Sequence, residues 1–162
     1  MCRKYVLISI KPQYATQIKK GNKTVELRKV VPKVCKGDTI VIYESAPIGK
    51  ITSYFKVEEI ITTAPEILWQ LVGEQTMVSK DTFDNYFKGR TLANGIRIGE
   101  IVSLKNPKKL GVIKKKYAPQ SYYYITKEEF YKINNENWVY KVNDSVVPLI
   151  NWIKYERRYN WH

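Results

Sequence analysis

The sequence predicts an α+β fold in which helices flank a small, strongly bent mixed sheet or barrel. Its 162 residues, 44% of them hydrophobic, suffice for one domain with one packed core. Short β-forming segments alternate with segments that carry helix start and stop signals. No linker rich in Gly, Ser or Pro interrupts the chain. We therefore expect a single domain over residues 1–162, in which residues 126–162 form a helical extension packed on the rest.

The N-terminal part of the chain predicts four strands and one helix. The strands are apolar runs, or segments in which apolar and polar residues alternate, at residues 5–10, 23–28, 39–43 and 51–61. Pro12 stands where a first helical turn begins, and Gly21 favours the left-handed conformation that ends a helix. The expected order is therefore one strand, one helix and three strands.

The middle of the chain predicts two helices and a long strand. Residues 63–66 have the sequence of a capping box, which begins the first helix. Ser79 is suited to cap the second helix, and Gly89 ends it. Residues 94–102 form a strand that we expect to be bent or bulged at Gly99.

The C-terminal part begins with a basic run and continues with helices. Lys114–Lys116 predicts either a solvated loop or a phosphate-binding loop. Residues 126–129 form a second capping box, which predicts a helix near residues 127–136. The segment 148–153 predicts a short helix followed by a basic, aromatic end.

The charge of the chain indicates a polyanionic partner. Lys and Arg number 28 against 15 Asp and Glu, so the net charge is +13, yet residues 62–105 carry five of each sign. A neutral middle between basic ends favours a one-sided positive surface. Thirteen Tyr and four Trp can supply stacking platforms for unpaired bases. We expect RNA or another single-stranded nucleic acid as partner; the alternative is that the lysines only confer solubility.

Several classes of protein are excluded by residue usage. The only histidine is His162, which removes Ser-His-Asp and Cys-His catalysis and His-rich metal sites. Cys2 and Cys35 are too few for a disulfide framework, which indicates a reducing compartment. We expect no metal and no cofactor. The N-terminus lacks the pattern of a signal peptide and no apolar run is long enough to span a membrane, so we expect a cytoplasmic protein with no membrane partner.

The densest polar group follows the first predicted helix. Glu26 and Arg28 lie two residues apart on a strand, so their side chains leave one face about 7 Å apart. Lys23 opens the strand, where burial can lower its pKa and make it a base or nucleophile. Arg28 can hold a phosphate or a base edge with its planar guanidinium. The alternative is a purely structural ion pair between Glu26 and Arg28.

The segment Ser9–Tyr14 is followed by Gly21, Lys23, Glu26 and Arg28, which form the pattern G-x-K-x-x-E-x-R. Together they resemble the signature of the ASCH domain, a branch of the PUA-like superfamily. Ala118–Tyr124 is similar to the P-P-Q-S-F-x-Y segment of a bacterial and phage ASCH subgroup, with Ala118 in place of the first proline. The resemblance covers about residues 5–125.

This resemblance implies a small PUA-like β-barrel whose helix-flanked cleft binds RNA or a modified nucleobase. By position, Lys23, Glu26 and Arg28 would line or support that cleft. Some ASCH members hydrolyse acetylated cytidine and others are reported to cleave RNA. The amidohydrolase branch pairs its lysine with a threonine nucleophile, and Glu26 occupies that threonine's position here, which argues against acetylcytidine hydrolysis.

Two functional hypotheses follow, of which binding ranks first. The first is a module that binds RNA around one unstacked base. The second is a hydrolase acting on RNA or a modified nucleoside, with Lys23 and Glu26 as acid–base residues and the hydroxyl of Ser121 assisting. Tyr43 and Ser45 lie where a strand leaves the barrel and can meet a ligand, although Tyr43 also suits core packing. The other candidate nucleic-acid contacts are Lys11, Tyr14, Lys20, Gln120, Lys114, Lys115 and Lys116.

Overall fold

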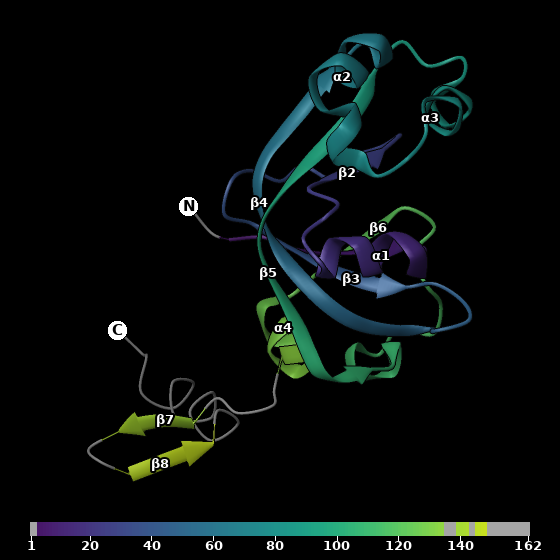
Figure 1. Cartoon of the computed structure of the whole chain (residues 1–162). Coiled ribbons are helices and arrows are strands. Elements are labelled where there is room, and N and C mark those ends of the chain that lie inside the picture. Colours follow the sequence, from purple (N-terminus) through teal and green to yellow (C-terminus); the bar gives the residue numbers. More distant parts are fainter. Residues whose placement is uncertain (1–2, 135–138, 143–144, 149–162) are drawn as a thin grey trace.

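The computed structural model describes residues 3–134, 139–142 and 145–148 (Figure 1). One mixed sheet contains β1 (Tyr5–Ile10), β2 (Val25–Arg28), β3 (Thr39–Glu44), β4 (Lys50–Thr63), β5 (Ala93–Lys108) and β6 (Tyr122–Ile125). Its strand order is β2-β5-β4-β3-β1-β6. Only β1 and β3 run parallel, and every other neighbouring pair in this sheet is antiparallel.

Four α-helices and two 3-10 helices accompany the sheet in the described part of the chain: α1 (Pro12–Lys19), α2 (Pro65–Val72), η1 (Gly73–Thr76), α3 (Lys80–Phe87), η2 (Leu110–Ile113) and α4 (Lys127–Asn134). Figure 1 shows that the long strands β4 and β5 curve along their length. Helix α1 lies in the concave side of this curl, α2 and α3 lie at one end, and α4 lies at the other. The result is a curled six-stranded half-barrel with helices, which confirms the predicted α+β class.

Apolar side chains on both faces of the sheet explain why its central strands are nearly continuous hydrophobic runs. Along β1, Val6 and Ile8 enter the core beneath α1, whereas Leu7 enters the core shared with α4. A third core joins α2 and α3 to β2 around Leu68 and Phe83. Helices α1 and α4 therefore bury their apolar sides in separate cores, and α2 and α3 share the third.

The predicted bulge at Gly99 is present and bends β5. Phe55 pairs with Ile101 and Val57 with Ile98, so β5 contains one extra residue between these pairs. A Cβ atom on Gly99 would lie 2.9 Å from the carbonyl oxygen of Lys56. Glycine is therefore required by the close approach of β4.

The helix boundaries differ from expectation in one place. The predicted capping box at residues 63–66 is wrong: Thr63 pairs with Ala93 as the last residue of β4, and Ala64 is the N-cap without a side-chain hydrogen bond. Ser79 does cap α3, because its Oγ accepts a hydrogen bond from the amide of Thr82 at 3.2 Å. In the second predicted box, Thr126 and Glu129 exchange hydrogen bonds of 2.8 and 3.1 Å at the start of α4.

Beyond α4, the described residues form the strands β7 (Val139–Val142) and β8 (Ser145–Pro148), which pair with each other in a separate two-stranded sheet. These strands and β6 are not predicted from the sequence pattern. The short helix expected over residues 148–153 lies outside the described residues except at Pro148. In the described ranges, no helix has the length and apolar character needed to cross a membrane.

Candidate functional site

A cavity of about 390 Å³ opens between β1, β2 and α1 on one side and α3 on the other. Its wall mixes charged, polar and aromatic side chains. The lining residues that matter for its chemistry are Lys11, Tyr14, Lys23, Glu26, Arg28, Thr82, Tyr86 and Gln120. The volume lies in the range of about 300–1,000 Å³ typical of small-molecule sites.

The turn after α1 delivers Lys23 to this cavity. Gly21 has a φ of 77°, which lets the chain reverse direction at the end of the helix. The amides of Asn22 and Lys23 then donate to the carbonyl oxygen of Gln17, at 3.0 and 3.1 Å. Lys23 therefore lies just before β2 in a fixed turn, with its side chain directed inward.

The Lys23 side chain is almost fully buried, at 2% exposure. Its Nζ donates to the carbonyl oxygen of Thr76 at 2.7 Å and lies 3.3 Å from Oε2 of Glu26. Burial lowers the pKa of Lys23, and the neighbouring carboxylate of Glu26 partly opposes this effect. The arrangement gives the site a lysine that loses its proton more readily than an exposed one.

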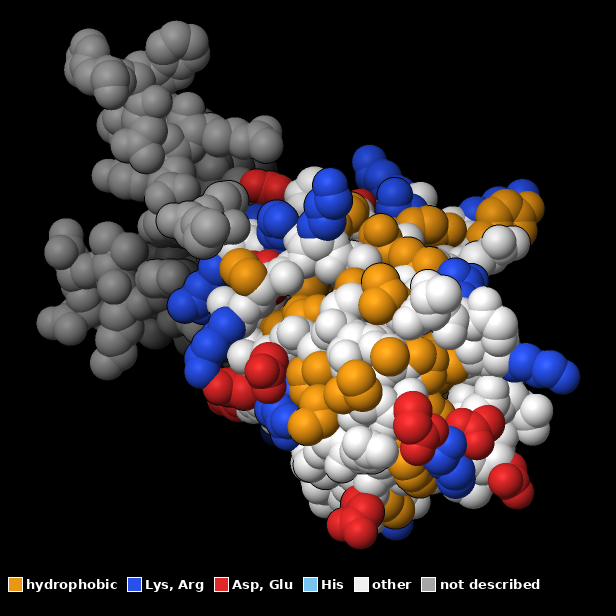
Figure 2. All heavy atoms as spheres, turned by 90° about the horizontal axis from the view of Figure 1, so that it is seen from above, with side chains coloured by type: hydrophobic (Ala, Val, Ile, Leu, Met, Phe, Trp, Pro, Cys, Tyr) orange, Lys and Arg blue, Asp and Glu red, His pale blue; other side chains and the backbone are white. Residues whose placement is uncertain are grey.

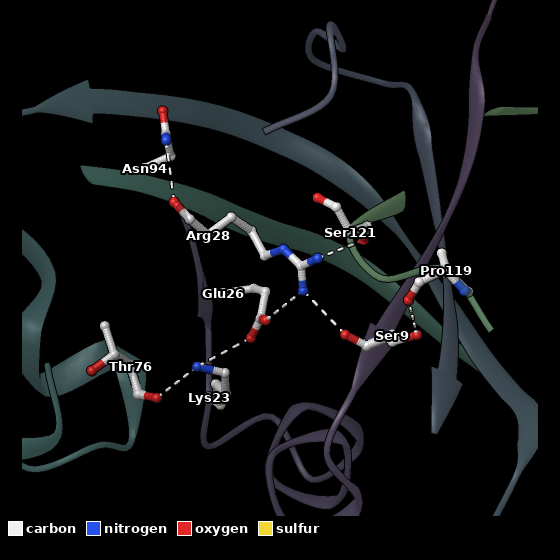
Figure 3. A network of polar contacts seen from close by, with 8 residues as sticks. All are labelled: Ser9, Lys23, Glu26, Arg28, Thr76, Asn94, Pro119 and Ser121. Carbon is white, nitrogen blue, oxygen red and sulfur yellow. Dashed lines mark hydrogen bonds and ion pairs between the residues drawn. The ribbon is translucent and has the colours of Figure 1, made fainter. Parts of the chain in front are cut away.

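Arg28 closes the open side of the half-barrel. Its Nη1 donates to the carbonyl oxygen of Ser9 at 3.1 Å and its Nη2 to that of Ser121 at 2.6 Å (Figure 3). Because β2 is one edge strand of the sheet and β6 the other, this side chain connects the two edges. Nη1 also lies 3.8 Å from Oε1 of Glu26. The structure thus contains the Glu26–Arg28 pair, but Lys23 is the nearer partner of Glu26.

The segment before β6 is held by two contacts, one from β1 and one from β2. Ser9 donates from Oγ to the carbonyl oxygen of Pro119 at 2.9 Å, next to the bond from Arg28 to Ser121. These contacts place Gln120 at the cavity wall. Ser121 contacts Arg28 through its backbone carbonyl and is not among the residues that line the cavity.

The other sequence-predicted residues divide between the cavity and the rest of the surface. Lys11, Tyr14 and Gln120 line the cavity together with Lys23, Glu26 and Arg28. Tyr43 packs against the core on the α4 side, so its ring serves packing. Residues outside the cavity lining are Lys20, Ser45 and Lys114–Lys116. In that basic run, Lys115 lies over the ring of Tyr123 and Lys116 over that of Tyr117, each 5.4 Å from the ring centroid.

The wall contributed by α3 was missed from the sequence. Phe83 and Tyr86 both line the cavity, and Nζ of Lys29 lies 4.9 Å from the ring centroid of Tyr86. The spacing of Phe83 and Phe87 indicates an apolar helix face, but nothing in the sequence shows that this face meets β2. Figure 2 views the α2–α3 end and shows hydrophobic side chains exposed among polar ones. Ile67 and Leu71 of α2 are 49% and 58% exposed.

The site offers a ligand one carboxylate, an amide, cationic groups and tyrosine rings. Glu26 is an acceptor, Gln120 is both donor and acceptor, and Tyr14 and Tyr86 provide flat surfaces. In the described part of the chain, no three His, Cys, Asp or Glu side chains come together in a group that could hold a metal ion.

Known proteins are similar to this chain in sequence and in fold. The model of the ASCH domain family matches residues 8–146. A protein of Zymomonas mobilis subsp. mobilis called "ASCH domain-containing ribonuclease" is 28% identical over 134 residues, which are 81% of this chain and 90% of that protein.

Solved structures of other proteins also resemble this chain. The crystal structure of ASCH from Zymomonas mobilis has a TM-score of 0.76 at 27% identity, over 81% of this chain and 94% of that one. The N-terminal domain of Staphylothermus marinus McrB has a TM-score of 0.52 at 12% identity, over 85% of this chain and 99% of that one, which is a likeness of fold.

Proposed function

The chain belongs to the ASCH domain family, and from this premise we propose that it binds single-stranded RNA and holds one unpaired base in the cavity between α1, β2 and α3. The observation that carries the proposal is the composition of the cavity. A carboxylate and a side-chain amide can recognise a base edge, and Tyr14 and Tyr86 can stack on a base face. This combination suits a nucleobase better than an apolar ligand.

The basic surface supplies the phosphate contacts in this proposal. Lys11 lies at the cavity, and the lysines at 114–116 lie a few residues before the cavity residue Gln120. Two of these lysines lie over tyrosine rings, so the run combines cations with aromatic faces. An RNA strand that has one base in the cavity can therefore continue along the segment 114–120. The net charge of +13 favours its approach.

The test is a titration of a labelled single-stranded RNA, followed by fluorescence anisotropy at several salt concentrations. We expect binding at low salt that weakens steeply as salt rises, and that weakens several-fold in Lys11→Ala. Lys36→Ala is the matched control, because Lys36 is an exposed lysine paired with Glu58 and does not line the cavity. A protein that fails to bind RNA at low salt would overturn the proposal.

A second candidate function is RNA hydrolysis, which is favoured by the relative called a ribonuclease. In this case a neighbouring hydroxyl attacks phosphorus and loses its proton to Glu26, the bond from phosphorus to the leaving oxygen of the backbone breaks, and that oxygen takes a proton from Lys23, whose charge stabilises the negative charge that develops. The Ser121 hydroxyl would have to turn toward the cavity to assist. The geometry supports proton transfer by Lys23 and Glu26, which are paired at the cavity, more directly than assistance by Ser121, which does not line it.

Hydrolysis is tested by incubating the protein separately with single-stranded RNA and with acetylated cytidine. We expect any turnover to depend on Lys23, so that Lys23→Ala abolishes it. Circular dichroism of Lys23→Ala separates loss of chemistry from loss of structure, and Ser121→Ala tests whether the hydroxyl assists. Turnover that persists in Lys23→Ala contradicts this mechanism.

A further inference from the structure

We propose that the cavity selects guanine, because Glu26 can accept both N–H groups on the Watson–Crick edge of that base; the inference rests on the proposed RNA binding. Glu26 carries the carboxylate among the residues that line the cavity. Its side chain is 9% exposed, so a base edge would meet it out of bulk water. An interaction there discriminates more strongly than one on the surface.

The two neighbouring cations leave Glu26 with capacity to accept further hydrogen bonds. Nζ of Lys23 lies 3.3 Å from one carboxylate oxygen, and Nη1 of Arg28 lies 3.8 Å from the other. Charge-assisted N–H···O bonds are shorter, about 2.7–2.9 Å. A carboxylate has about four lone-pair sites. Both oxygens can therefore accept a ligand donor while the cations stay in place.

The cations themselves are engaged by the protein backbone. Lys23 donates to the carbonyl oxygen of Thr76, and both terminal nitrogens of Arg28 donate to carbonyl oxygens, those of Ser9 and Ser121. They position Glu26 more than they contact a ligand. The floor of the cavity therefore presents an acceptor, and it favours a base that offers donors.

Guanine is the base that matches this acceptor. Its N1–H and its exocyclic N2 amino group are adjacent and parallel, so they can meet both oxygens of one carboxylate. Adenine and cytosine each place a ring-nitrogen acceptor beside their amino group, and uracil flanks its N3–H with two carbonyl oxygens. Those acceptors would face the carboxylate and repel it. The Gln120 amide, which also lines the cavity, can donate to O6 of guanine.

The experiment compares oligouridylates that contain a single central G, A, C or inosine. We expect the wild-type protein to bind the guanine oligonucleotide at least about tenfold more tightly than oligouridylate, the usual scale of a bidentate base contact. Inosine lacks the N2 amino group, so it should lose most of this preference. Glu26→Gln, which places an amide donor against the base, should bind the guanine oligonucleotide no more tightly than oligouridylate.

Glu44→Gln is the matched control. Glu44 is also a buried carboxylate, 3% exposed, paired with Lys19 and bonded to Thr52 Oγ1 at 2.6 Å, but it does not line the cavity. We expect this variant to keep the guanine preference. Equal affinity of the wild type for all the oligonucleotides would overturn guanine selection and leave RNA binding intact, whereas no binding would overturn the proposed function itself. If Glu26→Gln does not fold, the guanine–inosine comparison on the wild type decides.

Discussion

Lys23 is held in the interior by backbone geometry as well as by charge. The turn after α1 fixes its position, the carbonyl oxygen of Thr76 accepts a hydrogen bond from its Nζ, and Glu26 balances its charge. Buried ion pairs of this kind contribute little net stability, because both groups lose their hydration. Removing one partner is costly, since the other is left buried and unpaired.

Lys23→Met tests this dependence. We expect the free energy of unfolding to fall by about 3 kcal/mol at neutral pH, because Glu26 loses its nearer cation inside the protein. Urea denaturation measures the change. Lys36→Met is the control: it breaks the exposed pair with Glu58, and a loss below about 1 kcal/mol is expected. Equal losses in the two variants would show that the burial of the Lys23 pair has no energetic consequence.

The lowered pKa of Lys23 predicts how stability depends on pH. Between this lowered pKa and the ordinary lysine pKa of 10.5, the unfolded chain keeps the Lys23 proton while the folded protein has released it. Stability rises with pH where the unfolded state binds more protons. The wild type should therefore gain stability relative to Lys23→Met as pH rises through this window, by up to about 1.4 kcal/mol per pH unit. Urea titrations of both proteins at pH 7 and pH 10 measure the difference, and a constant difference contradicts the assignment.

At the scale of the elements, local sequence predicts a strand or helix well where the pattern of its own side chains determines its structure. The apolar run in β1 and the alternation in β2 are predicted because their side chains fill the cores. The capping box at residues 63–66 fails because pairing of Thr63 with Ala93 extends β4. That partner lies 30 residues further along the chain, so no local pattern contains it.

Gly99→Ala tests whether the bulge bends the sheet as the fold requires. The new Cβ would lie 2.9 Å from a backbone oxygen of β4, which cannot move without shifting a strand. We expect a loss of about 1–3 kcal/mol in the free energy of unfolding, the usual cost of overpacking. Gly111→Ala is the control, because its Cβ would meet no atom within 4 Å. A Gly99→Ala protein as stable as this control would show that the close approach relaxes freely.

Arg28 joins the two edge strands, so its replacement should affect both the sheet and the site. Arg28→Ala should lower the free energy of unfolding modestly, by about 1–3 kcal/mol, because Glu26 loses a cation and two carbonyl oxygens lose a donor. RNA affinity should fall clearly, because the segment that carries Gln120 loses one of its two contacts, the bond from Arg28 to Ser121. Arg28→Lys keeps the charge but lacks the planar fork that reaches both carbonyls, so it should resemble Arg28→Ala. Urea denaturation and anisotropy measure the two effects, and full RNA binding by a folded Arg28→Ala contradicts the role.

At the scale of the molecule, the sequence predicts one wall of the cavity and not the other. The G-x-K-x-x-E-x-R pattern brings Lys23, Glu26 and Arg28 to one place because a single turn and strand hold them. Tyr86 reaches the same cavity only because α3 packs across β2. Such a contact depends on the order of strands in the sheet, which local periodicity does not specify.

The basic run at 114–116 tests whether the charge of the whole molecule, or its placement, governs RNA binding. Replacing Lys114, Lys115 and Lys116 with Ala should weaken RNA binding, and it should lower the slope of log affinity against log salt by up to about 2, since each phosphate contact on a single strand contributes about 0.7. The free energy of unfolding of this triple variant should equal that of the wild type, because these side chains lie outside the three cores. The control replaces three exposed lysines elsewhere, Lys33, Lys36 and Lys132, and lowers the net charge equally. Equal slopes in both triple variants would mean that net charge alone attracts RNA. If the Lys114–Lys116 variant binds RNA normally and Arg28→Ala merely unfolds, RNA does not follow the path from the cavity along this segment.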